Sequence, residues 1–190
     1  MSLVERRQLR TRWDIAQAAC KLFLRDGYDN VTAEVIAEEV GASLRTFYRY
    51  FSSKDETLSP IITSGTAELA EHIAARPAEE SLADAVRIAY AQISAAVGLE
   101  QVRQLITLLT SVPALRARWL HDLRTIEDAL VPAILQRTAD LSDNDARLTA
   151  AVIVTCLRVC LEQSTRSESE QPLADTLGCC LQYLRRGAHL

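Results

Sequence analysis

The stretch Val31–Lys54, VTAEVIAEEVGASLRTFYRYFSSK, decides the fold. Thr32 is a suitable N-cap, because its hydroxyl can accept a hydrogen bond from an otherwise unpaired backbone N–H at a helix start. Gly41 follows eight residues after Ala33, and glycine tolerates the positive φ at which many helices end. Between them, apolar residues recur at the spacing of one helical face, namely Ala33, Ile36, Ala37 and Val40. The pattern predicts a short helix that stops at a tight turn.

A second short helix is predicted over Leu44–Phe51, with Ser43 as its N-cap. Phe47 and Phe51 are four residues apart, so both point to the same side of this helix and can be buried together. Two short helices joined by a tight turn that contains glycine form a helix-turn-helix, whose second helix can enter the DNA major groove.

The side chains outside this buried pair suit contacts with DNA. Arginine can bond guanine O6 and N7 in a bidentate pair, and apolar atoms can touch a thymine methyl. The expected base contacts are Leu44, Arg45, Tyr48 and Arg49. Hydroxyl and ammonium groups can bond phosphate oxygens, which fix the register without reading the sequence. The expected phosphate contacts are Thr32, Thr46, Tyr50 and Lys54.

Residues 11–58 resemble the DNA-binding domain of the TetR (tetracycline repressor) family of bacterial transcription regulators. The sequence departs from the family at Ala42, where valine is commoner, and at Arg45, where glycine is common. The matching residues follow the family's order and spacing, and they are Ala18, Ala19, Leu22, Phe23, Gly27, Tyr28, Val31, Thr32, Ile36, Ala37, Gly41, Ala42, Ser43, the run Thr46–Phe51, Ser53, Lys54 and Asp55.

The resemblance implies a homodimer that binds a palindromic operator in double-stranded DNA, most often as a repressor, and that holds a small-molecule effector among its C-terminal helices. No motif names that effector. The candidate pocket residues are Tyr90, Arg103, Thr107, Trp119, His121, Arg124 and Arg158. Arg158 lies in an otherwise apolar run and needs a partner. We expect it to pair across the dimer with a carboxylate such as Glu162; an anionic effector is the alternative.

Composition fits an all-α chain with an N-terminal helix-turn-helix domain over residues 1–54 and a C-terminal helical bundle over residues 55–190. The chain has 190 residues, 48% of them apolar and 24% charged, with only six glycines and five prolines. These values are typical of a globular protein. No run alternates as strands do.

Further helices are expected along the chain. The first covers Thr11–Asp26, and a capping box of Ser53 and Glu56 starts a helix of about five turns that ends near Ala75. Pro132 is expected to kink a later helix. The other predicted helices are 82–97, 100–111, 113–139, one capped by Ser142 that ends near Thr165, and 172–187.

Two of these helices predict a dimer. Residues 146–163 are apolar around most of the circumference, which calls for burial on more than one side. The last helix also has a broad apolar band, namely Leu173, Leu177, Cys180, Leu181 and Leu184. We expect these helices to meet their copies in a four-helix interface about a two-fold axis. A large monomeric core is the alternative.

The net charge of −4 is unevenly distributed, because residues 1–54 contain nine Lys/Arg and seven Asp/Glu, a net charge of +2. The arginines of the N-terminus are either a basic arm that contacts phosphate or a frayed, solvated end. They are Arg6, Arg7, Arg10 and Arg12. The chain has five cysteines, an odd number, and no CxxC pair, so a disulfide framework is not expected. It also shows no signal peptide and no long apolar run. We therefore expect a protein of the reduced cytoplasm that does not span a membrane.

The sequence shows no pattern for catalysis, and we expect no catalytic residue, metal site or cofactor. The three histidines lack a second ligand at helical spacing, and nucleophile and phosphate-loop motifs are missing. Cys156 and Cys160 share a helix face; a redox or metal sensor could use them, but buried cysteine is commoner. Two other readings stay open, an all-helical enzyme and a protein-interaction module that does not bind DNA. Steep salt dependence would favour DNA over the latter.

Overall fold

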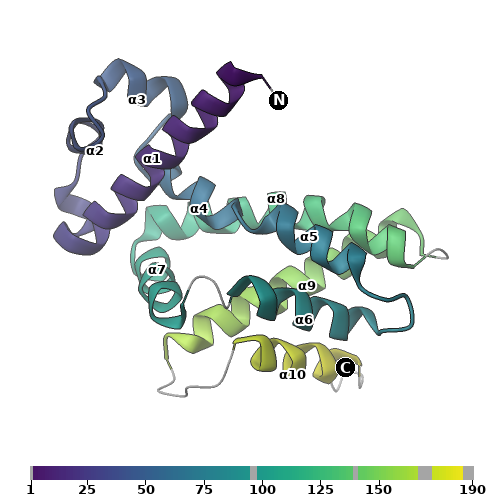
Figure 1. Ribbon diagram of the computed structural model, residues 1–190. Coiled ribbons are helices and arrows are strands. Elements are labelled where there is room, and N and C mark those ends of the chain that lie inside the picture. The colour runs from purple at the N-terminus through teal and green to yellow at the C-terminus, as the bar shows by residue number, and fades with distance from the viewer. Residues whose placement is uncertain (1, 95–97, 139–140, 167–172, 186–190) are drawn as a thin grey trace. The chain divides into compact units, whose positions relative to one another are not determined.

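The computed structural model describes residues 2–94, 98–138, 141–166 and 173–185, and within these ranges it contains helices and no strand (Figure 1). The all-α prediction is therefore confirmed. The α-helices are α1 (Leu3–Asp26), α2 (Ala33–Glu39), α3 (Leu44–Tyr50), α4 (Ser59–Thr63), α5 (Thr66–Ala75), α6 (Leu82–Ser94), α7 (Leu99–Ser111), α8 (Pro113–Arg137), α9 (Asp143–Ser164) and α10 (Leu173–Arg185). Short 3₁₀ helices cover Tyr28–Asn30 and Asp55–Leu58.

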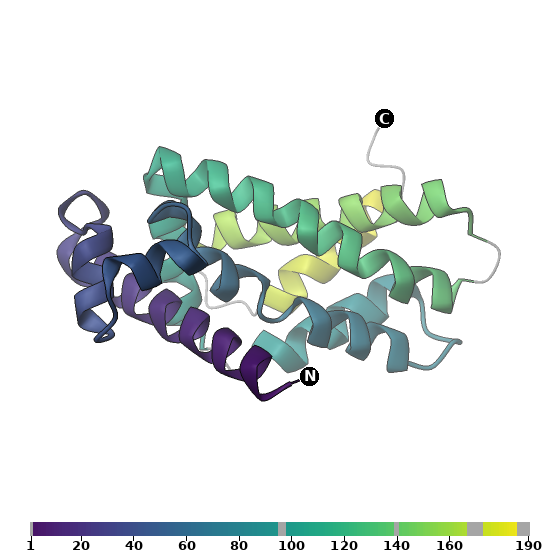
Figure 2. The same cartoon turned by 90° about the horizontal axis from the view of Figure 1, so that it is seen from above.

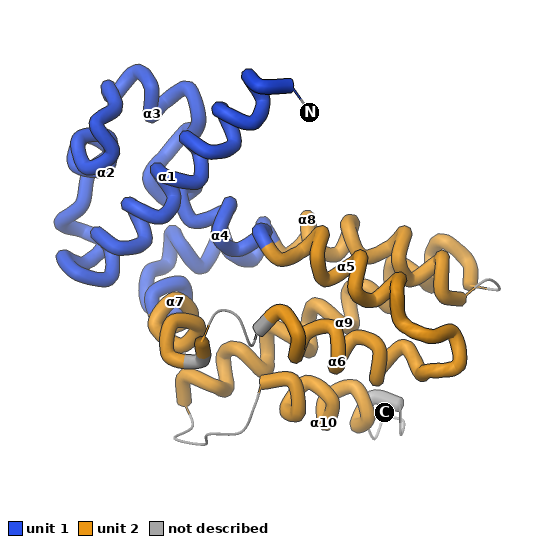
Figure 3. The backbone as a smooth tube through the Cα atoms, viewed as in Figure 1, with its two compact units in different colours: residues 1–64, 108–122 blue, residues 65–107, 123–190 orange. Residues whose placement is uncertain are grey.

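The chain divides into two compact units (Figure 3). The first contains residues 1–64 together with residues 108–122, and the second contains residues 65–107 and 123–190. The end of α7 and the first part of α8 therefore belong to the unit that holds α1, α2 and α3. Helix α8 continues from the first unit into the second.

Helix α1 starts at Leu3, so the predicted start at Thr11 was wrong (Figure 2). Ser2 and Glu5 form a capping box: the Ser2 hydroxyl accepts a bond of 3.2 Å from the Glu5 N–H, and the Glu5 carboxylate accepts one of 2.7 Å from the Ser2 N–H. The N-terminal arginines thus lie on a helix rather than on a frayed arm. The buried face of α1 includes Ile15, Ala19, Leu22 and Phe23.

The predicted single helix from the Ser53 region to Ala75 is also wrong. The segment is a 3₁₀ turn followed by two separate helices, α4 and α5, with a break at Ser64 and Gly65. The Glu56 carboxylate accepts bonds from the N–H and the hydroxyl of Ser52, at 2.9 Å and 2.8 Å. It was expected to bond Ser53 in a capping box. The expected capping box is therefore replaced by a contact four residues back.

The core of the second unit is built from α5, α6, α8, α9 and α10. Its most buried side chains include Ile73, Leu130, Ile134, Ile153 and Leu177. Helix α8 continues through Pro132 to Arg137. Helix α9 begins at Asp143, and the Ser142 hydroxyl accepts a bond of 3.1 Å from the Asp145 N–H, as the predicted cap requires. The predicted end of α10 near residue 187 lies outside the described residues, as does the side chain of Leu184.

Arg158 does not need a second chain for its partner. Its Nη1 lies 3.0 Å from Oε1 of Glu162 on the same helix, four residues later. Both side chains are largely buried, with 27% and 18% of their surface exposed. The prediction of an ion pair with Glu162 was right in its partner and wrong in placing that pair across a dimer, because the helical spacing already brings the two side chains together.

Candidate nucleic-acid interface

The helix-turn-helix is held by local caps at each of its corners. The Thr32 hydroxyl accepts a bond of 3.4 Å from the Val35 N–H at the start of α2, and the Ser43 hydroxyl accepts one of 3.1 Å from the Thr46 N–H at the start of α3. Between them Gly41 has a φ of 64°, which costs an L side chain energy and costs glycine little. These three residues set the angle at which α3 leaves the turn.

Helix α3 has one buried and one exposed face. Phe47 and Phe51 are 0% and 1% exposed, and their ring centroids lie 5.8 Å apart. Arg45, Tyr48 and Arg49 are exposed, with 55% of the Tyr48 surface accessible. Leu44 is half-buried at the start of the helix. The structure therefore presents three of the four predicted base-reading side chains to solvent from one short helix.

The side chains predicted to contact phosphate already make hydrogen bonds within the protein, and they do so to different extents. Lys54 donates bonds of 2.8 Å and 2.9 Å to the carbonyls of Tyr28 and Val31, and its Nζ lies 3.9 Å from the centre of the Tyr28 ring. One of its three donors remains for a phosphate. The Thr46 hydroxyl lies 3.0 Å from that of Ser43.

The other two phosphate candidates differ from each other. Thr32 is exposed, but its hydroxyl also bonds the carboxylate of Glu34 and thereby lowers the pKa of Glu34. Tyr50 is half-buried at the end of α3, where the Arg49 guanidinium carbon lies 5.0 Å from the centre of its ring.

A polar network that the sequence did not reveal lies behind the helix-turn-helix. Arg118 of α8 donates from Nε to the Ser59 hydroxyl at 2.9 Å and to Asp122 Oδ1 at 3.1 Å, and its Nη2 lies 3.8 Å from Glu56 Oε1. Asp122 is only 3% exposed. The guanidinium thus joins α8 to the segment that follows the helix-turn-helix. Asp122 lies at helical spacing, four residues after Arg118, but Ser59 and Glu56 are too distant in sequence for a helical pattern to find.

The charge of Glu56 is favoured within this network. Burial alone would raise the pKa of Glu56, but the bonds from the N–H and hydroxyl of Ser52, together with the cations Arg118 and Arg12, outweigh burial and lower it. Glu56 is therefore held as a carboxylate next to Arg118.

The predicted effector residues are divided between the two compact units. Trp119 and His121 belong to the first unit and the other five to the second. Trp119 is a core residue with 2% exposure, and burial raises the pKa of Tyr90 to about 12. Arg103 is half-buried, Thr107 and His121 are exposed, and Arg158 is paired within its helix.

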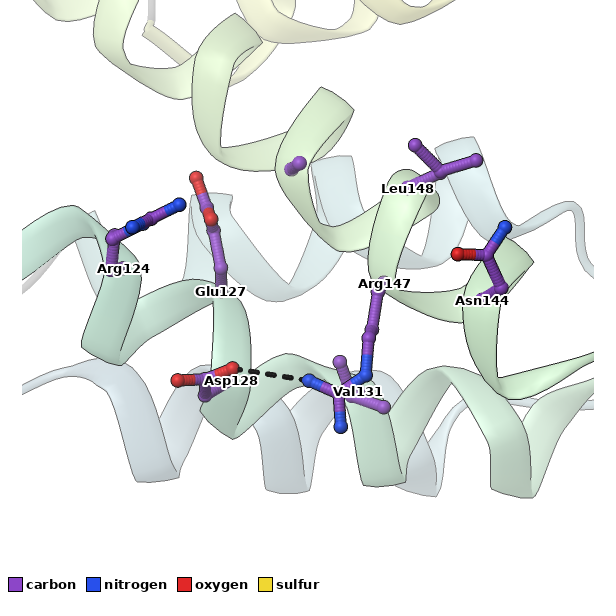
Figure 4. Close-up of a pocket in the computed structure, with 8 residues that line it drawn as sticks. Arg124, Glu127, Asp128, Val131, Asn144, Arg147 and Leu148 are labelled. Atoms are coloured by element: carbon purple, nitrogen blue, oxygen red, sulfur yellow. Dashed lines mark hydrogen bonds and ion pairs between the residues drawn. The ribbon is translucent and has the colours of Figure 1, made fainter.

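The remaining candidate, Arg124, lines a groove of about 390 Å³ between α8 and α9 (Figure 4). Arg147 in this groove pairs with Asp128 at 3.4 Å and with Asp143 at 2.9 Å. The other lining residues are Glu127, Val131, Asn144, Leu148 and Ala151. The groove is rich in charged side chains of both signs, which suits a polar ligand better than an apolar one.

The thiols of Cys156 and Cys160 behave as core side chains. Cys160 Sγ of α9 lies 3.5 Å from Cys180 Sγ of α10. Burial, together with the neighbouring thiols, raises the pKa of Cys160 to about 12, and burial also raises that of Cys156. Because the thiolate is the reactive form, these thiols are poor sensors. No group of three or more His, Cys, Asp or Glu in the described ranges is placed to hold a metal ion.

None of the helices in the part of the chain that the structure describes is long and apolar enough to span a membrane.

Comparison with known proteins decides the family. Residues 15–59 match the family described as bacterial regulatory proteins of the tetR family, and residues 76–189 match the MftR C-terminal domain. The chain is 34% identical over 154 residues to the HTH-type transcriptional regulator TcmR of Streptomyces glaucescens, covering 76% of this chain and 68% of TcmR. The chain belongs to the TetR family. The helix-turn-helix resemblance is thereby confirmed, and the protein is a DNA-binding transcriptional regulator.

A second relative and two solved structures agree with this assignment. The HTH-type transcriptional repressor AcnR of Corynebacterium diphtheriae is 28% identical over 130 residues, which cover 68% of this chain and 66% of AcnR. Among solved structures, the TetR-family repressor FadR of Thermus thermophilus has a TM-score of 0.64 at 22% identity, covering 93% of this chain and 94% of FadR. A putative TetR-family regulator of Mesorhizobium loti has a TM-score of 0.57 at 18% identity over 95% and 98% of the two chains. These two structures share the fold.

Proposed function

We propose that this TetR-family regulator is a repressor that binds a palindromic operator as a homodimer and is released from it by a small molecule. Residues 1–54 serve DNA binding, and residues 55–190 serve effector binding and dimerisation. We also place the protein in the bacterial cytoplasm, where its operator lies. The observation that carries the proposal is the exposed face of α3, which presents Arg45 and Tyr48 from a helix-turn-helix.

The exposed apolar side chains of the second unit support a homodimer. Leu148 and Val152 are four residues apart on α9, and 59% and 43% of their surfaces are exposed. Tyr183 on α10 is 52% exposed. Contiguous exposed apolar patches commonly mark protein–protein interfaces, and we propose that a second copy of the chain covers these side chains. Because a two-fold dimer places two reading helices in successive major grooves, it also explains a palindromic operator.

The comparisons support repression and release by a ligand. AcnR is named a repressor, and FadR is a repressor whose structure was solved in complex with lauroyl-CoA. As proposed here, effector binding favours a conformer whose two α3 helices no longer match the operator spacing. Such a switch requires only that the effector bind one conformer more tightly than the other.

Replacing Arg45 with alanine is expected to weaken operator binding by about 2 kcal/mol, because one good bidentate contact with a base contributes roughly that much discrimination. The loss should concentrate at one base pair of each half-site, where the variant no longer prefers one base. Binding of wild type and variant to operators mutated at each position, together with footprints, measures this loss.

Glu38→Ala is the matched control, because Glu38 is exposed on α2 and is not a predicted contact. It should keep the wild-type base preference at every position. If Arg45→Ala also kept that preference throughout, Arg45 would not read a base, and the role of α3 in direct readout would have to pass to another side chain.

A further inference from the structure

A groove of about 570 Å³ runs between the first turns of α1 and the end of α3, within the first unit. Arg12 lines it from α1, and Arg49 and Tyr50 line it from α3; Glu5, Gln8 and Leu9 complete the lining. The carboxylate of Glu5 is taken by the Ser2 N–H at the start of α1. The groove therefore combines two guanidinium groups, a phenol and an amide with one carboxylate, that of Glu5.

Neither arginine forms an ion pair within the described residues, although the charge of Arg12 also acts on the Glu56 carboxylate and helps to lower its pKa. No carboxylate lies within 4.0 Å of the nitrogens of Arg12 or Arg49. The Arg12 Nε is inaccessible to water and has no hydrogen-bond partner. An unpartnered, buried donor of a charged group is costly in a folded protein and calls for an explanation, of which a bound water or anion is one.

Both guanidinium groups are held in place by aromatic rings. The Cζ of Arg12 lies 5.5 Å from the centre of the Phe51 ring, and the Cζ of Arg49 lies 5.0 Å from the centre of the Tyr50 ring. Contacts between a cation and a ring face are attractive and limit the freedom of the side chain. The two cations are therefore positioned before any anion arrives.

We propose that Arg12, Arg49 and Tyr50 form a clamp for one phosphodiester of the DNA backbone. This inference rests on the proposed function. Planar guanidinium groups match the oxygens of a phosphate, and the Tyr50 hydroxyl and Gln8 amide can donate to the same group. In this proposal Arg12 contacts DNA directly, so that α1 contributes to DNA binding together with α3.

The clamp also changes the role of Arg49 from base reading to backbone binding. In helix-turn-helix complexes the residues near the N-terminus of the reading helix contact base edges. Arg45 is the second residue of α3, whereas Arg49 is one turn later and next to the final residue, Tyr50. Arg49 also shares its groove with Arg12 of another helix. Both features fit a contact at the edge of the major groove, where the backbone runs.

The test compares Arg12→Gln and Lys21→Gln in the full-length chain. Lys21 is an exposed cation nine residues later on α1, which places it on the opposite side of that helix, outside the groove. Affinity for the operator duplex selected from a random pool, and for an unrelated duplex, is measured between 50 mM and 200 mM salt. Thermal unfolding of each variant confirms that it is folded.

Removing one phosphate contact should reduce the slope of log affinity against log salt by about 0.9, which is roughly a threefold smaller change over this salt range. Arg12→Gln should show this reduction on both duplexes, and Lys21→Gln a smaller one. Arg12→Lys keeps the charge and should keep the slope. Arg49→Gln should behave as Arg12→Gln does and should leave base preference unchanged.

Three results would overturn the clamp. In the first, Arg12→Gln follows the same salt slope as wild type. In the second, Arg49→Gln loses its preference at one base pair, which would return Arg49 to base reading. In the third, inorganic phosphate saturates a site that is lost in Arg12→Gln, but the salt dependence of DNA affinity is the same in this variant and in wild type. That result would assign the groove to a free anion. If the wild-type protein bound neither duplex, the proposed function itself would fail instead.

Discussion

Replacing Arg118 with alanine is expected to destabilise the protein by about 3 kcal/mol, since removing one partner of a buried ion pair leaves an uncompensated charge. The charge left behind is that of Asp122, whose surface is 3% exposed. Its Oδ1 is bonded by Arg118 at 3.1 Å, and its Oδ2 has no hydrogen-bond partner among the described residues. The midpoint of urea unfolding, followed by circular dichroism, measures the loss.

Arg116→Ala is the control, because Arg116 is an exposed arginine two residues earlier on α8. It should change stability by no more than about 0.5 kcal/mol, as surface substitutions do. Adding Asp122→Asn to Arg118→Ala should restore part of the lost stability, because the buried charge is then gone. Equal stability of Arg118→Ala and Arg116→Ala would show that Asp122 does not depend on Arg118.

The loss of stability caused by Arg118→Ala should be smaller at acidic pH than at neutral pH. The pKa of Glu56 is lowered in the folded protein. Burial opposes this shift, the two bonds from Ser52 are its main cause, and the charge of Arg118 adds to it. A carboxyl group with a lowered pKa stabilises the folded state at neutral pH, and this stabilisation is lost as the pH falls through its folded pKa. The difference in stability between wild type and Arg118→Ala should therefore narrow as Glu56 is protonated.

Phe47→Ala and Tyr48→Ala should separate folding from DNA binding. Phe47 is fully buried against Phe51, and truncating a buried phenylalanine to alanine costs about 4 kcal/mol through lost burial and the cavity left behind. Phe47→Ala should therefore lower the unfolding midpoint and lose DNA binding with it. Tyr48 is 55% exposed, so Tyr48→Ala should remain folded and lose affinity for the operator.

Urea unfolding and operator binding, measured on the same preparations, check both substitutions. The two residues are adjacent on α3, so that they serve as controls for each other. The assignment of the two faces of α3 would be contradicted if Tyr48→Ala were the less stable variant, or if Phe47→Ala stayed folded and bound the operator normally.

The helix-turn-helix was predictable because its determinants are local. The caps Thr32 and Ser43, the turn at Gly41 and the pair of Phe47 and Phe51 all act over a few residues, and the structure shows each of them in its predicted place. The early start of α1 was equally local. The capping box of Ser2 and Glu5 is visible in the sequence, but it lies at the chain terminus, where helices commonly fray.

The errors arose where contacts distant in sequence override local preference. The segment after Phe51 has the cap and the helical propensity for one long helix, but Lys54 bonds carbonyls near residue 30 and Glu56 lies beside Arg118. Periodicity carries no information about such partners. The clamp groove escaped prediction for the same reason, because Arg12 and Arg49 are separated by two intervening elements and converge only in the folded unit.

The most direct test of the account is selection of bound duplexes from a random pool with the purified protein, repeated at 50 mM and 200 mM salt. The account predicts an enriched palindrome whose half-site centres lie one helical turn or a multiple of it apart, and an affinity that falls steeply as salt rises. A folded protein that enriches no sequence, or whose binding does not respond to salt, would contradict operator binding through α3 and favour a protein-interaction role for this surface.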